Sequence, residues 1–373
     1  MKKSLIALLV ATLPAAAFAD VTIYGKIKGG VEYVDNGSTK QTNVDDLGSR
    51  IGFKGSEDLG NGLKTIWQVE TGFGIDGTGT GSSSGTFANR NSFIGLQGDF
   101  GTVRLGNVSN FLDSDMGTVD TWEYSSNDLG LGIFTRDGVR LKNSVRYDLP
   151  TVVPGLTAAI QYGTKEDKTA STQSRETSVV GLGYENSGFF GKYAYIHESK
   201  ASAGYTLNDT YTQWSYKAND KHRLEVGYNA NNLFVGLGYQ QQKGGYDIVG
   251  TGWATVVNGF GLKSALNAAG ISTLNQDVKT QEYALTAAYT LGAFTPKFTY
   301  AHGKDIKVNG ESVNNTGYDQ YVLGVDYAIS KRTTFGAQYG QISVKGQGLN
   351  NAGTAFVDNK NQKAFGLNMV HKF

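Results

Sequence analysis

The chain alternates apolar and polar residues with a period of two in many separate segments. The stretch RLKNSVRYD shows the scheme clearly. Leu141 and Val145 share one side of this stretch, whereas Arg140, Lys142 and Arg146 share the other. A β-strand carries this pattern when its two faces meet different media. We therefore expect a strand with an apolar environment on one face and water on the other.

Sixteen segments of this kind can be found, and helical periodicity is scarce; the best helical candidate is short. The pattern predicts an all-β chain. The expected strands span 20–34, 47–57, 62–74, 87–98, 101–107, 139–149, 155–164, 174–185, 188–198, 220–229, 232–243, 279–291, 294–303, 318–329, 333–344 and 362–373.

The links between these segments alternate strictly between short and long. The short links are rich in residues that make tight turns, and the eight long links are polar. An up-and-down sheet with short turns at one end and long loops at the other is typical of a transmembrane β-barrel. The short links lie at 58–62, 99–101, 149–155, 185–188, 229–232, 291–294 and 330–333.

A soluble β-sandwich could produce the same alternation. One face of every sandwich strand packs into a shared core, and here those faces would carry Lys26, Arg50, Arg90 and Arg140 among other cations. Burying unpaired charges costs on the order of several kcal/mol each. Water inside a wide closed barrel removes that cost, and closure also pairs every strand edge, as a bilayer requires. We therefore predict a 16-stranded antiparallel transmembrane β-barrel with short periplasmic turns and long extracellular loops.

The first residues have the features of a Sec-type signal peptide. Lys2 and Lys3 form a basic start, the apolar run LIALLVATLPAAAF follows, and AFA is a small-x-small cleavage site. The apolar run is too short for a comfortable membrane-spanning helix. We expect residues 1–19 to be a signal peptide that is removed on export, and residues 20–373 to form the barrel.

Composition and charge exclude several functions. The chain has no cysteine, which removes thiolate metal sites and cysteine nucleophiles. Without the two signal lysines it would carry 32 basic and 33 acidic residues, whereas a nucleic-acid binder usually has a basic excess. The four histidines lack metal-ligand spacing, and no GxSxG motif occurs. We expect no catalytic residue, no metal, no cofactor and no nucleic-acid partner.

The chain ends in a further alternating stretch, AFGLNMVHKF. Its last residue, Phe373, shares a face with Phe365, Leu367, Met369 and His371. A free terminus normally frays. A terminal strand that pairs with the first segment would instead close the barrel.

Several long blocks of the chain resemble one family. They include DLGSRIGFKGSEDLGNGLKTIWQVE, NRNSFIGLQGDFGTVRLGN, NSVRYD, TPKFTYAHG and YDQYVLGVDYAISKRT. These blocks are similar to those of the trimeric outer-membrane porins of Neisseria-type Gram-negative bacteria, and the resemblance runs from Asp20 to Phe373. It implies a homotrimer in the lipid bilayer of the bacterial outer membrane, with a third loop folded into the lumen. The implied function is passive diffusion of ions and small hydrophilic solutes through a water-filled channel.

In the porins that this chain resembles, a ladder of basic groups on the wall faces acidic groups on the third loop. Opposite charges across a narrow wet pore set a transverse field that separates anion and cation paths, and the wall cations favour anions. The matching wall positions are Lys26 of YGK, Arg50 of RIGFKG, Arg90 of NRNSF and Lys142 of the KNS step, while Arg140 shares their face by alternation alone.

The third long link, residues 108–138, provides the acids that would face this wall. The candidates are Asp113, Asp115, Asp120 and Glu123. The terminal Phe373 is similar to the residue that the outer-membrane assembly machinery reads in the resembling porins. We therefore expect it to act as an assembly signal.

Three other functions stay open at this point. An outer-membrane barrel hydrolase is disfavoured by the missing nucleophile motif. A secreted or surface adhesin or lectin would be soluble without detergent and would lack the C-terminal aromatic strand. A solute-selective outer-membrane channel would differ from a general porin only in its constriction.

Overall fold

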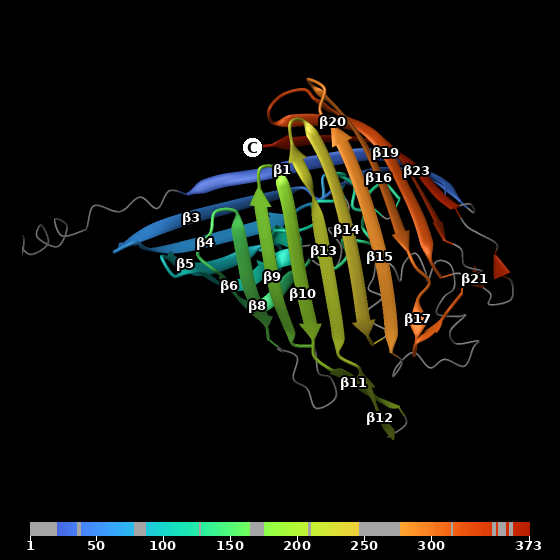
Figure 1. The fold of residues 1–373 in the computed structure, drawn as a ribbon, viewed down its shortest axis with the longest axis horizontal. Helices are drawn as coiled ribbons and strands as arrows, with labels where there is room; N and C mark the ends of the chain where they lie inside the picture. Colours follow the sequence, from blue (N-terminus) through green and yellow to red (C-terminus); the bar gives the residue numbers. More distant parts are fainter. Residues whose placement is uncertain are drawn as a thin grey trace, which may run out of the picture.

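The computed structural model describes residues 21–35, 39–77, 87–126, 128–164, 175–207, 210–245, 277–314, 316–344, 348–349, 356–357 and 361–373. The expected signal peptide lies outside the described residues. Sixteen long strands form one closed antiparallel barrel, as the alternation predicted (Figure 1). No helix in the described part of the chain has the length and apolarity needed to cross a bilayer.

Each barrel strand pairs with the next one along the chain, and the last strand pairs with the first over ten residue pairs. The predicted strand centres are all confirmed, and their ends shift by a few residues. The barrel strands are β1 (Thr22–Asp35), β3 (Arg50–Gly60), β4 (Leu63–Gly72), β5 (Ser92–Gly98), β6 (Gly101–Ser109), β7 (Arg140–Asp148), β8 (Leu156–Gly163), β9 (Thr177–Asn186), β10 (Phe189–Glu198), β13 (Asn219–Ala230), β14 (Leu233–Gly244), β15 (Val278–Tyr289), β16 (Phe294–Gly303), β19 (Tyr318–Ala328), β20 (Thr333–Val344) and β23 (Asn361–Lys372).

The second strand of the barrel is broken. β2 (Lys40–Asp46) pairs with the loop half of β1, whereas β3 pairs with its turn half. At the break, the side chain of Asp46 accepts hydrogen bonds of 2.9 and 3.2 Å from the amides of Gly48 and Ser49. Gly48 has φ +95°, a conformation that favours glycine. The remaining elements are α2 (Phe111–Ser114) and the hairpins β11–β12 (Ala201–Leu207, Thr210–Tyr216), β17–β18 (Lys307–Val308, Glu311–Ser312) and β21–β22 (Gly348–Leu349, Phe356–Val357).

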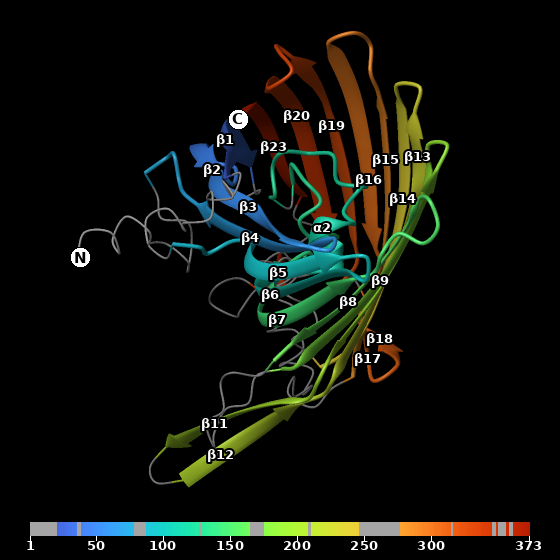
Figure 2. The same cartoon turned by 90° about the vertical axis from the view of Figure 1, so that its left-hand side faces the viewer.

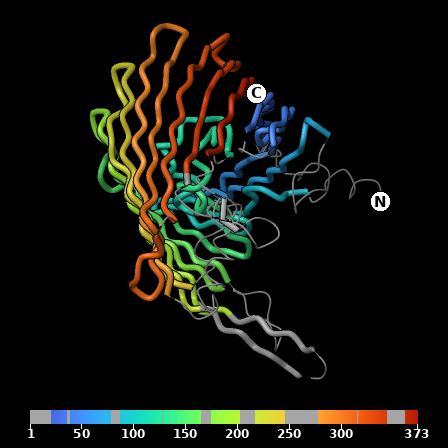
Figure 3. Tube along the Cα trace, turned by 90° about the vertical axis from the view of Figure 1, so that its right-hand side faces the viewer, coloured from blue at the N-terminus to red at the C-terminus, as the bar shows by residue number. Residues whose placement is uncertain are grey.

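The two ends of the barrel differ as the link lengths predicted. The tight turns between β9 and β20 lie toward the top of Figure 1 and the β3–β4 turn lies at its left, whereas β11, β12 and β17 lie at the bottom. Figure 3 shows that β13 to β20 form the taller side of the wall. Several of these strands have 12 residues, whereas β5 has only seven.

The strands carry apolar side chains on the outer face and mostly polar or loop-covered side chains on the inner face. On β19, Leu323 exposes 61% of its surface, whereas its neighbour Val322 is fully buried inside. Aromatic rings mark both ends of the outer apolar band: Tyr327 contacts Phe294 at the turn end, and Tyr321 contacts Tyr300 at the loop end, at ring distances of 4.7 and 4.9 Å. Six residues separate the two tyrosines of β19, roughly 20 Å at about 3.3 Å per residue. Aromatic rows on either side of an outer apolar band are typical of a barrel that crosses a bilayer.

Candidate pore constriction

The link between β6 and β7 folds into the barrel, and α2 lies inside the ring of strands (Figure 2). We call this link, residues 110–139, loop 3. Asn110 caps α2, because its side chain accepts a 2.9 Å hydrogen bond from the amide of Asp113. The side-chain amide of Asn110 also donates to the carbonyl of Asp137 at 2.8 Å. One asparagine therefore joins the start and the end of loop 3.

Loop 3 begins with an apolar contact against the inner wall. The ring of Phe111 lies over Gly181 of β9, where a Cβ atom would come within 2.0 Å of the ring. Any other residue at position 181 would displace the helix. The buried cluster around this contact contains Phe111, Leu112, Met116, Ala159, Val179, Ala194 and Ile196.

Charged groups bind two segments of loop 3, near Gly117 and near Arg136, to the taller side of the wall. Glu225 of β13 accepts hydrogen bonds of 3.0 and 2.8 Å from the amides of Gly117 and Thr118. Arg136 forms two hydrogen bonds of 2.7 Å with Glu282 of β15. Both carboxylates are fully buried, so each needs the partner that loop 3 supplies.

The middle of loop 3 reaches the seam where the barrel closes. The indole of Trp122 donates to the hydroxyl of Thr299 at 2.9 Å, and the ammonium of Lys297 lies 4.4 Å from its ring. The hydroxyl of Tyr124 donates to the carbonyl of Leu367 on β23 at 3.0 Å. Loop 3 thus covers the inner wall from β9 round to β23. These wall contacts of loop 3 lie outside β3, β4 and β5, and we call this side of the lumen the open side; Arg50 on β3 keeps 31% exposure there.

Three arginines gather on this open side. Arg50 begins β3, Arg90 precedes β5 and Arg140 begins β7. The carboxylate of Glu70, on β4, lies 2.7 Å from Nε of Arg90 and 3.6 Å from Nε of Arg50. The carboxylate of Asp113, on loop 3, lies 3.8 Å from the guanidinium of Arg140. It also attracts the charge of Arg50 electrostatically. The three arginine side chains keep 31%, 23% and 29% exposure, so they remain in contact with water.

A second charged group lies where loop 3 meets β1. The ammonium of Lys28 is 2.7 Å from the carboxylate of Glu123 and donates to its carbonyl at 2.8 Å. Lys26 lies two residues away on the same face of β1, directly opposite Lys372 of β23. Burial raises the pKa of Glu123, but the attraction of Lys28, Lys26 and Lys372 outweighs burial and holds that pKa below its usual value.

The other two expected acids contact groups that fix loop 3 itself. The carboxylate of Asp115 lies 2.8 Å from the guanidinium of Arg146. Asp120 accepts hydrogen bonds of 3.3 and 3.4 Å from the amides of Trp122 and Leu131. Desolvation of Asp120 by the surrounding loop raises its pKa to about 7. The structure therefore brings Asp113 and Glu123 to the wall cations and places Asp115 and Asp120 among the anchors.

The alternation of inner and outer residues fails in the first half of β7. The register of the β6–β7 pair shifts there, and Asn143 has φ 52°, as at a β-bulge. Leu141 packs against the α2 cluster inside the barrel, so the expectation of an apolar outer position for Leu141 is wrong. Val145, beyond the bulge, lies on the outer face. Lys142 lies exposed beside the bulge, and no ion pair among the described residues includes it.

Three residues of this site were not among the sequence-based candidates. They are Glu70, Lys28 and Arg146, which form ion pairs with Arg90, Glu123 and Asp115 respectively. Alternation along each strand places all three on inner faces, and this signal could have added them. It could not show which charge lies opposite each one, because that depends on the path of loop 3.

The C-terminal residue lies in the barrel wall at the turn end. The backbone of Phe373 exchanges hydrogen bonds of 3.0 and 3.1 Å with Gly25 of β1. A Cβ atom on Gly25 would lie 2.5 Å from the carbonyl oxygen of Arg50 and 2.6 Å from the ring of Phe373. Glycine at position 25 therefore leaves the room in which the terminal ring packs against the first strand.

Known proteins are similar to this chain in sequence and in architecture. A family model described as "Gram-negative porin" matches residues 4–347. The "Major outer membrane protein P.IB" of Neisseria sicca is 39% identical over 358 residues, which cover 90% of this chain and 92% of the relative. The protein of the same name from Neisseria meningitidis serogroup B is 38% identical over the full length of both chains.

Solved structures show the same fold at lower identity. An anion-selective porin from Comamonas acidovorans superposes with a TM-score of 0.71 at 21% identity, over 95% of this chain and all of the porin. The trimer form of OmpT from Vibrio cholerae gives 0.65 at 15% identity, over 95% and 99% of the two chains. The family favours a channel over an enzyme. The chain belongs to the Gram-negative porins, and it is a channel for passive diffusion across the bacterial outer membrane.

Proposed function

We propose that an arginine-lined constriction gives this channel a preference for small anions. The observation that carries the proposal is the convergence of Arg50, Arg90 and Arg140 on the side of the lumen that loop 3 leaves open. Glu70 offsets part of this charge, and Lys26 adds to it from the adjacent strand, where it lies opposite Arg50. A fixed cationic surface in a narrow aqueous path raises the local anion concentration.

The acids of loop 3 have two separate roles in this proposal. Asp113 and Glu123 form the anionic side of the lumen, facing the arginines and the lysines of β1 respectively. Asp115 and Asp120 instead keep loop 3 in place. A transverse field between the two sides orders water and favours small polar solutes over large apolar ones.

Reversal potentials in planar bilayers test the anion preference. The double variant Arg50→Ser, Arg90→Ser should lower the anion-to-cation permeability ratio by about sevenfold, because roughly one kT of local potential shifts the anion and cation concentrations in opposite directions. Arg332→Ser, in the tight turn before β20, is the matched control and should leave the ratio unchanged. A ratio that stays the same in the double variant would remove both arginines from the constriction. Adding candidate sugars in the same apparatus distinguishes a general porin from a solute-selective channel.

We propose further that the chain assembles as a homotrimer after residues 1–19 have been removed, and that the assembly machinery reads Phe373. The trimer form of the Vibrio cholerae protein, which has the same fold, supports the first part. The packing of Phe373 against Gly25 supports the last part, because the terminal ring lies at an exposed edge of the wall. Mass analysis of the mature chain and of its heat-modifiable oligomer tests these points.

A further inference from the structure

The outer face of the β14–β15 hairpin carries an ordered series of side chains that the channel does not use. The two strands pair without a register shift, so opposite residues form rungs whose side chains lie about 5 Å apart. The intervening residues, such as Gln242 and Glu282, are buried on the inner side. From the loop end, the outer rungs are Lys243 with Lys279, Gln241 with Gln281, Tyr239 with Tyr283, and Leu237 with Leu285.

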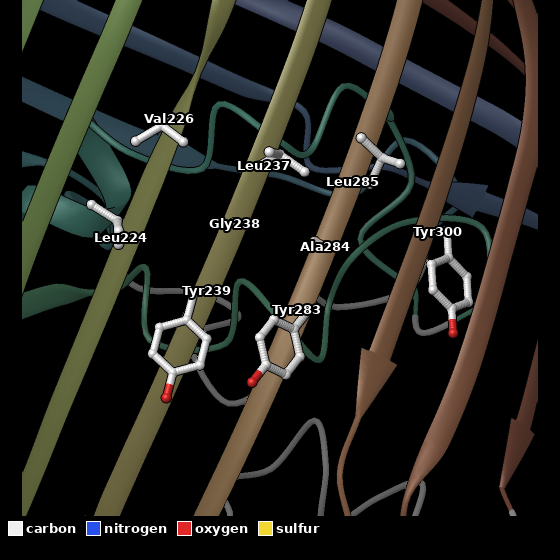
Figure 4. A pocket seen from close by; sticks show the side chains of 9 residues that line it. All are labelled: Leu224, Val226, Leu237, Gly238, Tyr239, Tyr283, Ala284, Leu285 and Tyr300. Atoms are coloured by element: carbon white, nitrogen blue, oxygen red, sulfur yellow. The ribbon is translucent and has the colours of Figure 1, made fainter.

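An apolar groove lies on the outer wall on the membrane side of the tyrosine rung (Figure 4). Its volume is about 270 Å³, and Leu224, Leu237 and Leu285 form its sides. The backbone of Gly238 and Ala284 lines the groove, because the Cβ positions of these two residues face inward, toward the cluster around Phe134. In Figure 4 the hydroxyls of the labelled tyrosines all point toward the loop end of the strands. The groove has the surroundings that a hydrocarbon chain needs, with polar groups at one end.

Lysines accumulate beyond the polar end of the groove. Lys307 of β17 stands directly opposite Lys279 in the β15–β17 pair, and so three lysines follow one another across three paired strands. The backbone amide of Lys304 donates to the carbonyl of Gln281 at 2.9 Å, and its ammonium lies 5.3 Å from the ring of Tyr283. Like charges opposite each other destabilise a sheet, and an anion bound to this row would relieve that repulsion.

Acidic groups on the same face neutralise only part of this charge. Asp277 lies 3.2 Å from Lys243. Asp220, opposite Lys243, is hydrogen-bonded to the side chains of Tyr195 and His197. Asp319 is likewise hydrogen-bonded to Tyr300 and His302. Among the residues that the structure describes, no ion pair includes Lys279, Lys304 or Lys307, so these three lysines form the cationic surplus at the polar end of the groove.

We propose that this face binds a phosphorylated glycolipid of the outer leaflet. One acyl chain occupies the groove, the sugar lies against the glutamine and tyrosine rungs, and its phosphate meets the lysines. The lysine rung is four residues beyond the tyrosine rung, roughly 13 Å at about 3.3 Å per residue. This spacing suits a phosphate carried on a sugar, whereas the phosphate of a glycerophospholipid lies next to its acyl esters. The long loops place this end of the barrel in the outer leaflet.

Native mass spectrometry of the full-length protein in detergent tests the proposal. Three probes are compared: bisphosphorylated lipid A, its dephosphorylated form, and phosphatidylglycerol. We expect lipid A to be retained best. The double variant Lys279→Gln, Lys307→Gln should weaken its binding by about tenfold or more, since each lysine near a membrane surface contributes about 1 kcal/mol. Lys64→Gln, Lys331→Gln removes two exposed lysines at the turn end and serves as the matched control.

A second pair of variants tests the groove. Leu237→Trp fills it and should reduce lipid A binding, whereas Leu367→Trp, on the outer face of β23, should not. Equal retention of dephosphorylated lipid A, equal retention of phosphatidylglycerol, or unaltered binding by the lysine variant would overturn the proposal. The lipid face and the arginine constriction involve separate residues, so either proposal can fail alone.

Discussion

Arg146 of β7 and Asp115 of loop 3 form an ion pair in which nitrogen and oxygen lie 2.8 Å apart. Only 2% of the Arg146 side chain is exposed. The same guanidinium contacts Asp148 at 2.7 Å and donates to the hydroxyl of Ser114 at 2.6 Å and to the carbonyl of Ser109 at 2.9 Å. One buried cation therefore connects β6, β7 and α2, and fixes the side of loop 3 that faces the arginines.

Replacement of this cation should loosen loop 3. Arg146→Ala removes the shared partner of Asp115 and Asp148, but both carboxylates are partly exposed and Asp148 keeps Arg104, so we expect a loss of about 1–3 kcal/mol. We expect lower thermal stability and noisier open-channel currents in single-channel recordings. Arg332→Ala, in an exposed turn, is the control. Currents as quiet as those of the unmodified channel would show that loop 3 does not depend on Arg146.

Neutralisation of Glu70 should strengthen the anion preference. The carboxylate of Glu70 lies between Arg50 and Arg90, and Glu70→Gln removes one negative charge while keeping the shape of the side chain. The permeability ratio from reversal potentials should therefore rise toward anions, in the opposite direction to the arginine variants. Glu57→Gln, exposed near the turn end of β3, is the matched control. A shift toward cations would contradict the proposed constriction.

Asp120 makes the stability of loop 3 dependent on pH. Desolvation raises its pKa from about 4 to about 7 in the folded protein. An acid whose pKa is higher in the folded state stabilises that state at low pH, and this contribution is lost as pH rises through the folded pKa. We expect the melting temperature to fall between about pH 4 and about pH 7. Asp120→Asn should remove this part of the dependence, whereas Asp113→Asn should keep it; identical pH profiles for the original protein and Asp120→Asn would refute the assignment.

The seam between the ends of the chain should be sensitive to both of its partners. Deletion of Phe373 removes the terminal ring, and Gly25→Ala places a Cβ atom where that ring packs. Both changes should reduce the yield of heat-modifiable oligomer in the outer membrane. Gly191→Ala on β10, where the added carbon meets only an ordinary contact with Val226 at 3.9 Å, controls for the loss of a strand glycine. Normal oligomer yield after deletion of Phe373 would rule out its role as an assembly signal.

The strands of this barrel could be predicted from the sequence because their signal is local. Each spanning strand meets lipid on one face and the barrel interior on the other, and the period of two records that contrast residue by residue. The segment predicted at 294–303 coincides with β16, and the segment at 333–344 coincides with β20. The inward path of the third loop was predicted from the family resemblance, because the period-two pattern carries no information about where a loop folds.

The arrangement of charges around loop 3 was decided by the tertiary structure. Asp113, Asp115 and Asp120 are equivalent in sequence, yet one faces the arginines, one pairs with Arg146 and one binds backbone amides of its own loop. The bulge at Asn143 turns Leu141 inward. These outcomes depend on contacts between residues far apart in the chain, and alternation along one strand carries no information about what lies opposite. The sequence thus determined the two faces of the regular strands, whereas the bulge in β7 and the fold of loop 3 across the lumen decided where that pattern breaks and which charges meet.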